Sequence, residues 1–399
     1  MTLPAEESVT PRSVGLAIFS LALVTFCLGS SEFALMGLLP QVANSLHVSL
    51  PAAGNAVSAY AIGVVVGAPL ITLATARMSR RTVMLLQMGW FTLTTTLSAF
   101  SPNLFTLELM RFLSGLPHGT LFGGGALTAA SLVPEGRRGR AVGHVFTGLT
   151  VANVVGAPLS TLAGNYADWR VSYIIIGCAG ILSFLLMMRY LPKDAPRPGA
   201  SVLGELAAFR RKQVWFLFAT VIFGCGGMFA VYTYFSAALI TVAHAPSWSI
   251  PLYQSLWGAG MVVGAYAGAM AMDRNPKMAA IGAFIWNLFV LALFALTLHS
   301  LPMVSITIFL LGGTIAVGPA MQVRLMSIAG DAQTMAASMN HAAFNMANAV
   351  GAWTGGAVLA AGLGYQWTGW AGVIIAAIGL VLFLLTSTET SARTSQKQA

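Results

Sequence analysis

The feature that most constrains this chain is a series of long apolar runs, the first of which extends from Ser13 to Leu39. About 20 consecutive apolar residues suffice for an α-helix to cross the hydrocarbon core of a bilayer. The sequence holds about twelve such runs. Only 8% of its residues are charged, against roughly 25% in soluble domains. We therefore expect an all-α polytopic membrane protein in which these twelve runs are transmembrane helices.

Positive charges are distributed unevenly between these runs. Most of the 20 Lys and Arg residues fall in alternate connections, in the tails or in the central loop, and only Arg111 and Arg170 fall elsewhere. Because positive residues stay on the cytoplasmic side of a membrane, we expect both termini and the central loop in the cytoplasm. The net charge of +9 then reflects topology and attraction to anionic membrane lipid. It does not indicate nucleic-acid binding, which needs a soluble basic face.

The two halves of the sequence resemble each other. The segment 152–157 (ANVVGA) recurs with one change as 347–352 (ANAVGA). We expect two pseudo-symmetric six-helix bundles, and repeats of this kind place the substrate site at the midplane between the halves. The predicted parts are a cytoplasmic tail over 1–12, a bundle over 13–190, a cytoplasmic linker over 191–213, a second bundle over 214–386 and a cytoplasmic tail over 387–399.

Glu32 lies inside the first apolar run, roughly two helical turns from its end. A carboxylate at this depth costs a few kcal/mol on insertion scales, and an isolated acid in a membrane span is by default a candidate proton or ion carrier. The alternative is a structural acid held by a neighbouring Arg. We expect a proton-coupling role for Glu32.

Arg111 is the basic residue that falls at a similar depth, in the fourth apolar run. Opposite charges at one depth can pair, which lowers the cost of burying both. Glu108 is a rival partner, because it precedes Arg111 by three residues on the same helix face. The sequence leaves open which carboxylate Arg111 binds.

Two histidines lie deep in apolar runs, His118 in the fourth and His341 in the eleventh. Histidine titrates near neutral pH, so either could relay a proton or contact substrate. A hydrogen-bonded packing role is an equal alternative for both. We include His118 among the proton-coupling candidates.

Polar and aromatic side chains in several runs could line a substrate pocket, since such pockets are mostly apolar with few polar anchors. In the eleventh run, residues 341, 344, 345 and 348 share one helix face. The alternatives are hydrogen bonds between helices and an aromatic belt at the membrane surface. The substrate-binding candidates are Phe33, Met36, Tyr60, Asn153, Tyr232, Phe235, Gln254, Trp257, His341, Phe344, Asn345 and Asn348.

Gly148, Gly156 and Pro158 fall in the fifth run. Small residues let helices approach each other, and a proline frees a backbone carbonyl and kinks a helix. We expect packing and bending here, which a gating motion could use. The three cysteines, Cys27, Cys178 and Cys225, have the spacing of neither a disulfide framework nor a metal site, and we expect them to be small buried residues.

Four stretches together resemble the major facilitator superfamily, and most closely its twelve-span drug:proton antiporters of the bacterial arabinose-efflux-like and chloramphenicol-exporter branch. The similarity covers essentially the whole chain. The stretches are Ser31 to Pro40, Ser58 to Pro69 with the following Arg77, Arg80 and Arg81, Arg111 to Gly119, and Gly148 to Gly164.

This resemblance implies a bacterial cytoplasmic-membrane antiporter, with Glu32 as proton carrier and Arg111 assisting the proton step. It also implies gating roles for Gly67, Pro69, Arg77, Arg80 and Arg81. One departure is that the family's motif usually carries an Asp among its basic residues, whereas residues 75–81 contain none. A second is that Ala157 stands where Gly is common.

The expected function is proton-coupled efflux of small amphipathic molecules, such as chloramphenicol-type antibiotics, by alternating access. Sugars or nucleosides are alternative cargoes, and a passive facilitator is an alternative mechanism. No nucleotide-binding glycine loop, metal-ligand cluster or nucleophile–base arrangement stands out in the sequence. We therefore expect no enzyme activity, no cofactor and no metal, with protons, a small-molecule substrate and lipid as the partners of a monomer.

Overall fold

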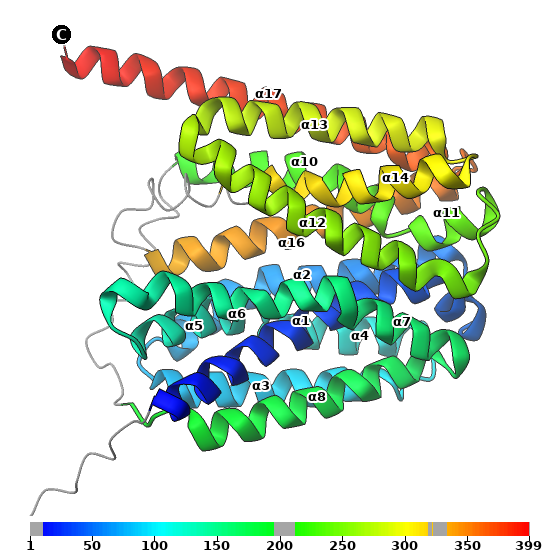
Figure 1. Cartoon of the computed structure of the whole chain (residues 1–399). Helices are drawn as coiled ribbons and strands as arrows, with labels where there is room; N and C mark the ends of the chain where they lie inside the picture. Colours follow the sequence, from blue (N-terminus) through cyan, green and yellow to red (C-terminus); the bar gives the residue numbers. More distant parts are fainter. Residues whose placement is uncertain (1–10, 195–211, 318–320, 322–332, 399) are drawn as a thin grey trace, which may run out of the picture.

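The computed structural model describes residues 11–194, 212–317, 321 and 333–398, and these residues form helices without strands. The fold is all-α and polytopic, and the helices of each half of the chain gather in their own layer (Figure 1). The first half holds α1 (Pro11–Ser45), α2 (Leu50–Thr75), α3 (Arg80–Ser98), α4 (Leu104–Gly115), α5 (His118–Ser131), α6 (Arg138–Val151), α7 (Ala157–Tyr166) and α8 (Trp169–Tyr190). The second half holds α10 (Lys212–Tyr232), α11 (Phe235–Thr241), α12 (Ile250–Arg274), α13 (Pro276–Thr297), α14 (Leu301–Gly312), α16 (Gln333–Ala360) and α17 (Gln366–Gln398).

Two ends of the bundle can be distinguished. The terminal end is where α1 begins and α17 ends, and the far end is opposite to it (Figure 1). Helices α2 and α16 pack against each other where the two halves meet. Residues 195–211, most of the predicted linker, and residues 1–10 of the predicted tail lie outside the described residues. The tail predicted after residue 386 continues α17 as a helix to Gln398.

Eight helical stretches in the described residues are long and apolar enough to cross a membrane. Of the other predicted spans, α3 and α16 are also continuous helices. The fourth apolar run is divided into α4 and α5 at Leu116 and Pro117, because proline lacks the N–H that would continue the helix.

One contact repeats in both halves and displays their pseudo-symmetry. The indole N–H of Trp90 in α3 donates to the carbonyl of Leu113 in α4 at 2.8 Å, and that of Trp286 in α13 donates to Leu310 in α14 at 3.3 Å. In the first half, Pro117 leaves the carbonyl four residues before it without a helical partner, and that carbonyl belongs to Leu113. Trp90 therefore satisfies an acceptor that the helix itself cannot.

The fifth predicted span contains a π-helical turn, Ala152–Gly156, which joins α6 to α7. Pro158 stands at the start of α7, and it has no N–H to donate to the carbonyl of Val154, four residues before it. Ser255 of α12 donates to this carbonyl at 2.9 Å. A proline in one half thus creates an acceptor that the other half uses.

The cysteines differ in their surroundings. Cys27 and Cys225 are buried, as expected, whereas Cys178 is exposed on α8. The expectation of burial was wrong for Cys178, because apolar residues of a membrane span also cover its lipid-facing side.

Candidate functional site

Glu32 lies in the middle of α1, where the two halves meet, and is almost completely buried. Its carboxylate accepts a hydrogen bond of 3.1 Å from the side-chain amide of Asn348 in α16. Hydrogen bonds to ionised groups are roughly twice as strong as those between neutral groups. The candidate proton carrier is therefore in direct contact with the opposite half.

Arg111 in α4 is fully buried and forms neither of the two ion pairs that the sequence left open. Neither Glu32 nor Glu108 lies within the 4.0 Å that defines a salt bridge. The guanidinium instead donates to the hydroxyl of Ser31 at 2.9 Å. Nε and Nη2 have no hydrogen-bond partner among the described residues, so two donor atoms remain available close to the segment that carries Glu32.

Two tyrosine rings face the Arg111 guanidinium and take the place of a carboxylate. The guanidinium carbon lies 4.1 Å from the ring centroid of Tyr60 and 5.7 Å from that of Tyr173. A cation over an aromatic face is stabilised by about 0.5–1 kcal/mol when exposed and about 2 kcal/mol when desolvated. Sequence reasoning missed Tyr173, and a tyrosine inside the apolar run of α8 was the only signal for it.

Tyr60 connects Arg111 to the histidines. Its hydroxyl is 2.7 Å from Nδ1 of His118, so a residue expected in the substrate pocket belongs to the polar cluster of the first half. Phe122 follows, with its ring centroid 6.3 Å from that of His118 and 4.2 Å from that of His341. The two histidines are thus linked through Phe122 across the boundary between the halves.

The aromatic candidates of the second half form a compact buried group. Tyr232 stacks on Trp257 at 3.8 Å and on Phe235 at 4.7 Å between ring centroids, and Phe33 of α1 meets Tyr232 edge-on at 6.1 Å. All four rings are buried. The alternative of an aromatic belt at the membrane surface is therefore excluded for these residues.

Two further hydrogen bonds join this aromatic group to α1. The amide of Gln254 donates to the carbonyl of Phe33 at 3.3 Å. The hydroxyl of Ser236 donates to the carbonyl of Met36 at 2.8 Å. Sequence reasoning found Gln254 but missed Ser236, because a serine in an apolar run carries no distinctive pattern. Both bonds hold the far-end part of α1 against the second half of the chain.

The predicted polar face of α16 divides into different roles. Asn348 reaches Glu32, and Phe344 packs against Phe229 with ring centroids 5.4 Å apart. The amide of Asn345 donates to the carbonyl of His341 in its own helix at 3.1 Å. Asn153 of the π-helical turn likewise donates to Leu149 of its own half at 2.9 Å.

The small residues of the motifs mark places where backbones approach closely. A Cβ on Gly67 would lie 1.9 Å from the carbonyl oxygen of Leu116, and one on Gly148 would lie 1.9 Å from that of Ala22. A Cβ on Gly156 would lie 2.2 Å from the hydroxyl of Ser30. Pro69 lies inside α2.

The basic motif after α2 contacts an acid that the sequence search did not find. The carboxylate of Asp194 accepts from the backbone N–H groups of Arg80 at 2.8 Å and Arg81 at 3.1 Å. The Arg81 guanidinium donates to the carbonyl of Met188 at 2.6 Å, and Arg77 is exposed. A carboxylate at the start of α3 is favourable because of the helix dipole. Asp194 is far from Arg80 and Arg81 in the sequence, so no sequence pattern indicated this contact.

Six side-chain hydrogen bonds join the halves among the described residues. Four of them have been described above, and their acceptors are Glu32, Phe33, Met36 and Val154. In the other two, the hydroxyl of Ser58 donates to the carbonyl of Ala349, and the amide of Asn165 donates to the carbonyl of Ser247. Helix α1 runs from the terminal end to the far end (Figure 1), and its three residues in these bonds, Glu32, Phe33 and Met36, lie in its second half.

Most of the chain is similar to known transport proteins in sequence and in structure. Residues 21–286 match the model of the Major Facilitator Superfamily. The inner membrane transport protein YdhP of Escherichia coli K12 is 38% identical over 93% of this chain and 95% of its own length. A chloramphenicol resistance protein of Streptomyces lividans is 29% identical over 92% of this chain and 95% of its own length. A bacterial homologue of the human lysosomal transporter Spinster, solved in an inward-facing and unoccupied conformation, has a TM-score of 0.74 at 15% identity and covers 95% of this chain and 98% of its own.

Proposed function

This chain belongs to the Major Facilitator Superfamily, and from that premise we propose that it exports small amphipathic organic molecules in exchange for protons. It works by alternating access in the bacterial cytoplasmic membrane, with both termini inside the cell. Glu32 carries the proton.

The observation that carries this proposal is the hydrogen bond between Glu32 of α1 and Asn348 of α16. It joins the two bodies that alternating access must move, and one of its partners is ionisable. Protonation removes the negative charge from the acceptor and so weakens a charge-assisted bond. Proton binding at Glu32 therefore loosens the contact between the halves.

Arg111 supports the same cycle. Its Nη1 donates to the hydroxyl of Ser31, the residue before Glu32, while Nε and Nη2 have no partner in the part of the chain that the structure describes. A buried charge with free donors is costly, so Arg111 is placed to bind the carboxylate once Asn348 moves away. Glu32 thereby exchanges one partner in the opposite half for another in its own half.

The free energy of the proton is adequate for export. A proton crossing about 150 mV releases roughly 3.5 kcal/mol, at about 2.3 kcal/mol per 100 mV. This corresponds to a concentration ratio of about a few hundredfold. One proton per substrate thus suffices for useful efflux.

The substrate class follows from the residues beside Glu32. Tyr232, Trp257, Phe235 and Phe33 offer aromatic surface, and Gln254 offers a polar group next to them. Apolar pockets with few polar anchors suit amphipathic drug-sized molecules. The relative named as a chloramphenicol resistance protein supports an antibiotic of that kind.

The test is substrate-driven proton movement in proteoliposomes that contain a pH-sensitive dye. Wild type, Glu32→Gln and the matched control Glu108→Gln are challenged with chloramphenicol, a sugar and a nucleoside. We expect chloramphenicol to move protons in wild type and Glu108→Gln, and not in Glu32→Gln, which still binds the drug.

Other outcomes point elsewhere. If Glu32→Gln moves protons as well as wild type, the acid is structural and His118 or His341 becomes the candidate carrier. If only the sugar or the nucleoside moves protons, the substrate class is wrong. If transport occurs without proton movement, the protein is a passive facilitator.

A further inference from the structure

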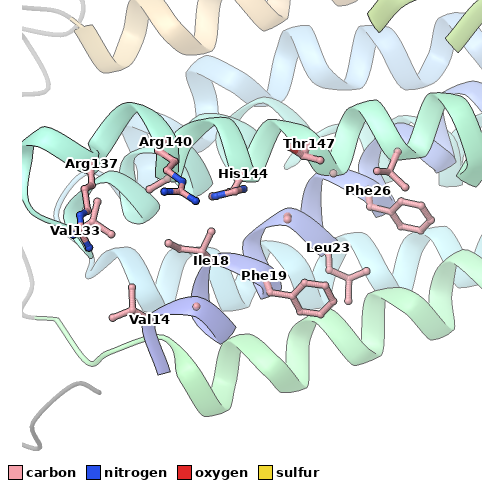
Figure 2. A pocket seen from close by; sticks show the side chains of 15 residues that line it. Val14, Ile18, Phe19, Leu23, Phe26, Val133, Arg137, Arg140, His144 and Thr147 are labelled. Atoms are coloured by element: carbon pink, nitrogen blue, oxygen red, sulfur yellow. The ribbon is translucent and has the colours of Figure 1, made fainter. Parts of the chain in front are cut away.

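A cavity of about 850 Å³ lies between the first half of α1 and α6, at the terminal end and away from the Glu32 cluster. Figure 2 shows its two parts. Phe19, Leu23 and Phe26 of α1 form an apolar wall, and Arg137, Arg140 and His144 stand at the other end. The cavity is thus an apolar groove with a basic end.

The groove opens on an exposed surface of α6. Thr147 and Val151 of α6 line the groove. Two more residues at the same helical spacing continue this line of side chains, Val155 in the π-helical turn and Leu159 in α7. Val151, Val155 and Leu159 are 41%, 42% and 57% exposed. An apolar stripe that stays exposed along a membrane-spanning helix faces hydrocarbon, whereas Phe146 on another face of α6 stacks inward on Phe122.

Among the residues that the structure describes, two arginines at the basic end have no acidic partner. The carboxylate of Glu135, the nearest acid in sequence, is bound by Arg138 at 3.4 Å. Arg137 and Arg140 are exposed and form no ion pair with any residue that the structure describes. Guanidinium groups bind phosphate oxygens in a bidentate manner.

The length of the groove matches one leaflet. Helix α6 rises about 16 Å between Arg140 and Val151, at 1.5 Å per residue, which is about half of a 30 Å hydrocarbon core. A phosphate held at the arginines would therefore have its acyl chain alongside the aromatic wall. A soluble phosphate would leave that wall uncovered.

We propose that this groove is a binding site for one anionic phospholipid of the leaflet at the terminal end. Its phosphate lies at Arg137 and Arg140, and one acyl chain lies along Phe19, Leu23 and Phe26. The lipid bridges α1, which carries Glu32, and α6, which leads into the π-helical turn.

The experiment is native mass spectrometry of the purified full chain with phosphatidylglycerol or phosphatidylcholine. We expect tighter retention of phosphatidylglycerol. The double variant R137Q/R140Q should weaken its binding by about tenfold or more, while R274Q/K277Q, which removes two exposed charges from the other half, should change it by less than about twofold.

A second pair of variants tests the apolar wall with the arginines intact. Thr147 is exposed and its hydroxyl bonds only to Gly143 of its own helix, so T147W fills the groove without removing a tertiary hydrogen bond. We expect T147W to reduce lipid retention and L159W, outside the groove, to leave it unchanged.

Several results would overturn the proposal. One is equal retention of the two lipids by wild type, and another is an equal loss in R274Q/K277Q. Displacement of phosphatidylglycerol by glycerol phosphate at similar concentration would show a site for soluble phosphate. A lipid-free dimer that T147W dissociates would show that a second copy occupies the groove.

Discussion

Ser255 of α12 donates a hydrogen bond to the carbonyl of Val154, which lies four residues before Pro158 and receives no N–H from that proline. The donor and acceptor belong to opposite halves. The contact therefore ties a local backbone irregularity to the relative position of the two bundles.

Ser255→Ala should leave this carbonyl unsatisfied. A buried acceptor without a partner costs about 1–3 kcal/mol, so we expect a lower unfolding temperature in detergent and a weaker association of the halves. Ser305→Ala is the matched control, because the Ser305 hydroxyl bonds only to Leu301 of its own helix. Equal effects of the two substitutions would show that Ser255 has no special role in joining the halves.

Asn348→Ala should remove the cross-half partner of Glu32. Hydrogen bonds to charged groups contribute about 1.5–3 kcal/mol, so we expect proton-coupled transport to fall by about tenfold or more. The measurement is the initial rate of substrate-driven proton movement in proteoliposomes. Asn287→Ala is the control, since the amide of the buried Asn287 also donates a hydrogen bond, to the carbonyl of Gly224 in the same half; a similar loss there would refute a specific role for the Glu32 contact.

Replacements of Tyr60 should separate its ring from its hydroxyl. Tyr60→Phe keeps the face over Arg111 and loses the contact with His118, whereas Tyr60→Leu loses both. Because the cation–π contact is desolvated, we expect Tyr60→Leu to be less stable than Tyr60→Phe by about 1–2 kcal/mol in reversible unfolding in detergent. Tyr266→Leu, at an exposed tyrosine, should change little, and equal stability of the two Tyr60 variants would mean that the ring does not stabilise Arg111.

Gly258→Ala should force the halves apart towards the far end. The added Cβ would lie 2.5 Å from the backbone carbonyl oxygen of Asn153, which cannot rotate away. We expect longer distances between spin labels on the turns at 46–49 and 242–246, measured by pulsed electron paramagnetic resonance spectroscopy. Gly282→Ala, where a Cβ meets nothing within 4 Å, is the control; unchanged distances in Gly258→Ala would show that the backbone absorbs the methyl group locally.

Much of the architecture could be predicted from the sequence because the bilayer imposes it. Length and apolarity identified the spans, and the repeat of ANVVGA in the second half indicated two related bundles. Glu32 could be found because an acid in an apolar run is costly and therefore informative. Its partner Asn348 was already among the candidates on a polar helix face.

Contacts between distant segments could not be predicted in the same way. Arg111 was expected beside a carboxylate, yet Tyr60 and Tyr173 surround it, and rings leave no charge pattern in a sequence. Asp194 and Ser255 are polar residues whose importance depends on a backbone group far away in the chain. The break at Leu116 and Pro117 was visible as a proline, but the apolar run on both sides favoured one continuous helix.

Pro158 also sets how far water must enter between the two halves when they separate. An unpaired carbonyl in hydrocarbon costs several kcal/mol, so a conformation that separates Ser255 from Val154 must offer this carbonyl another donor. Water is the donor that an opening between the halves would admit. The aqueous path from the far end must then reach at least to residue 154, which makes this carbonyl a marker of how deeply the opened protein is hydrated.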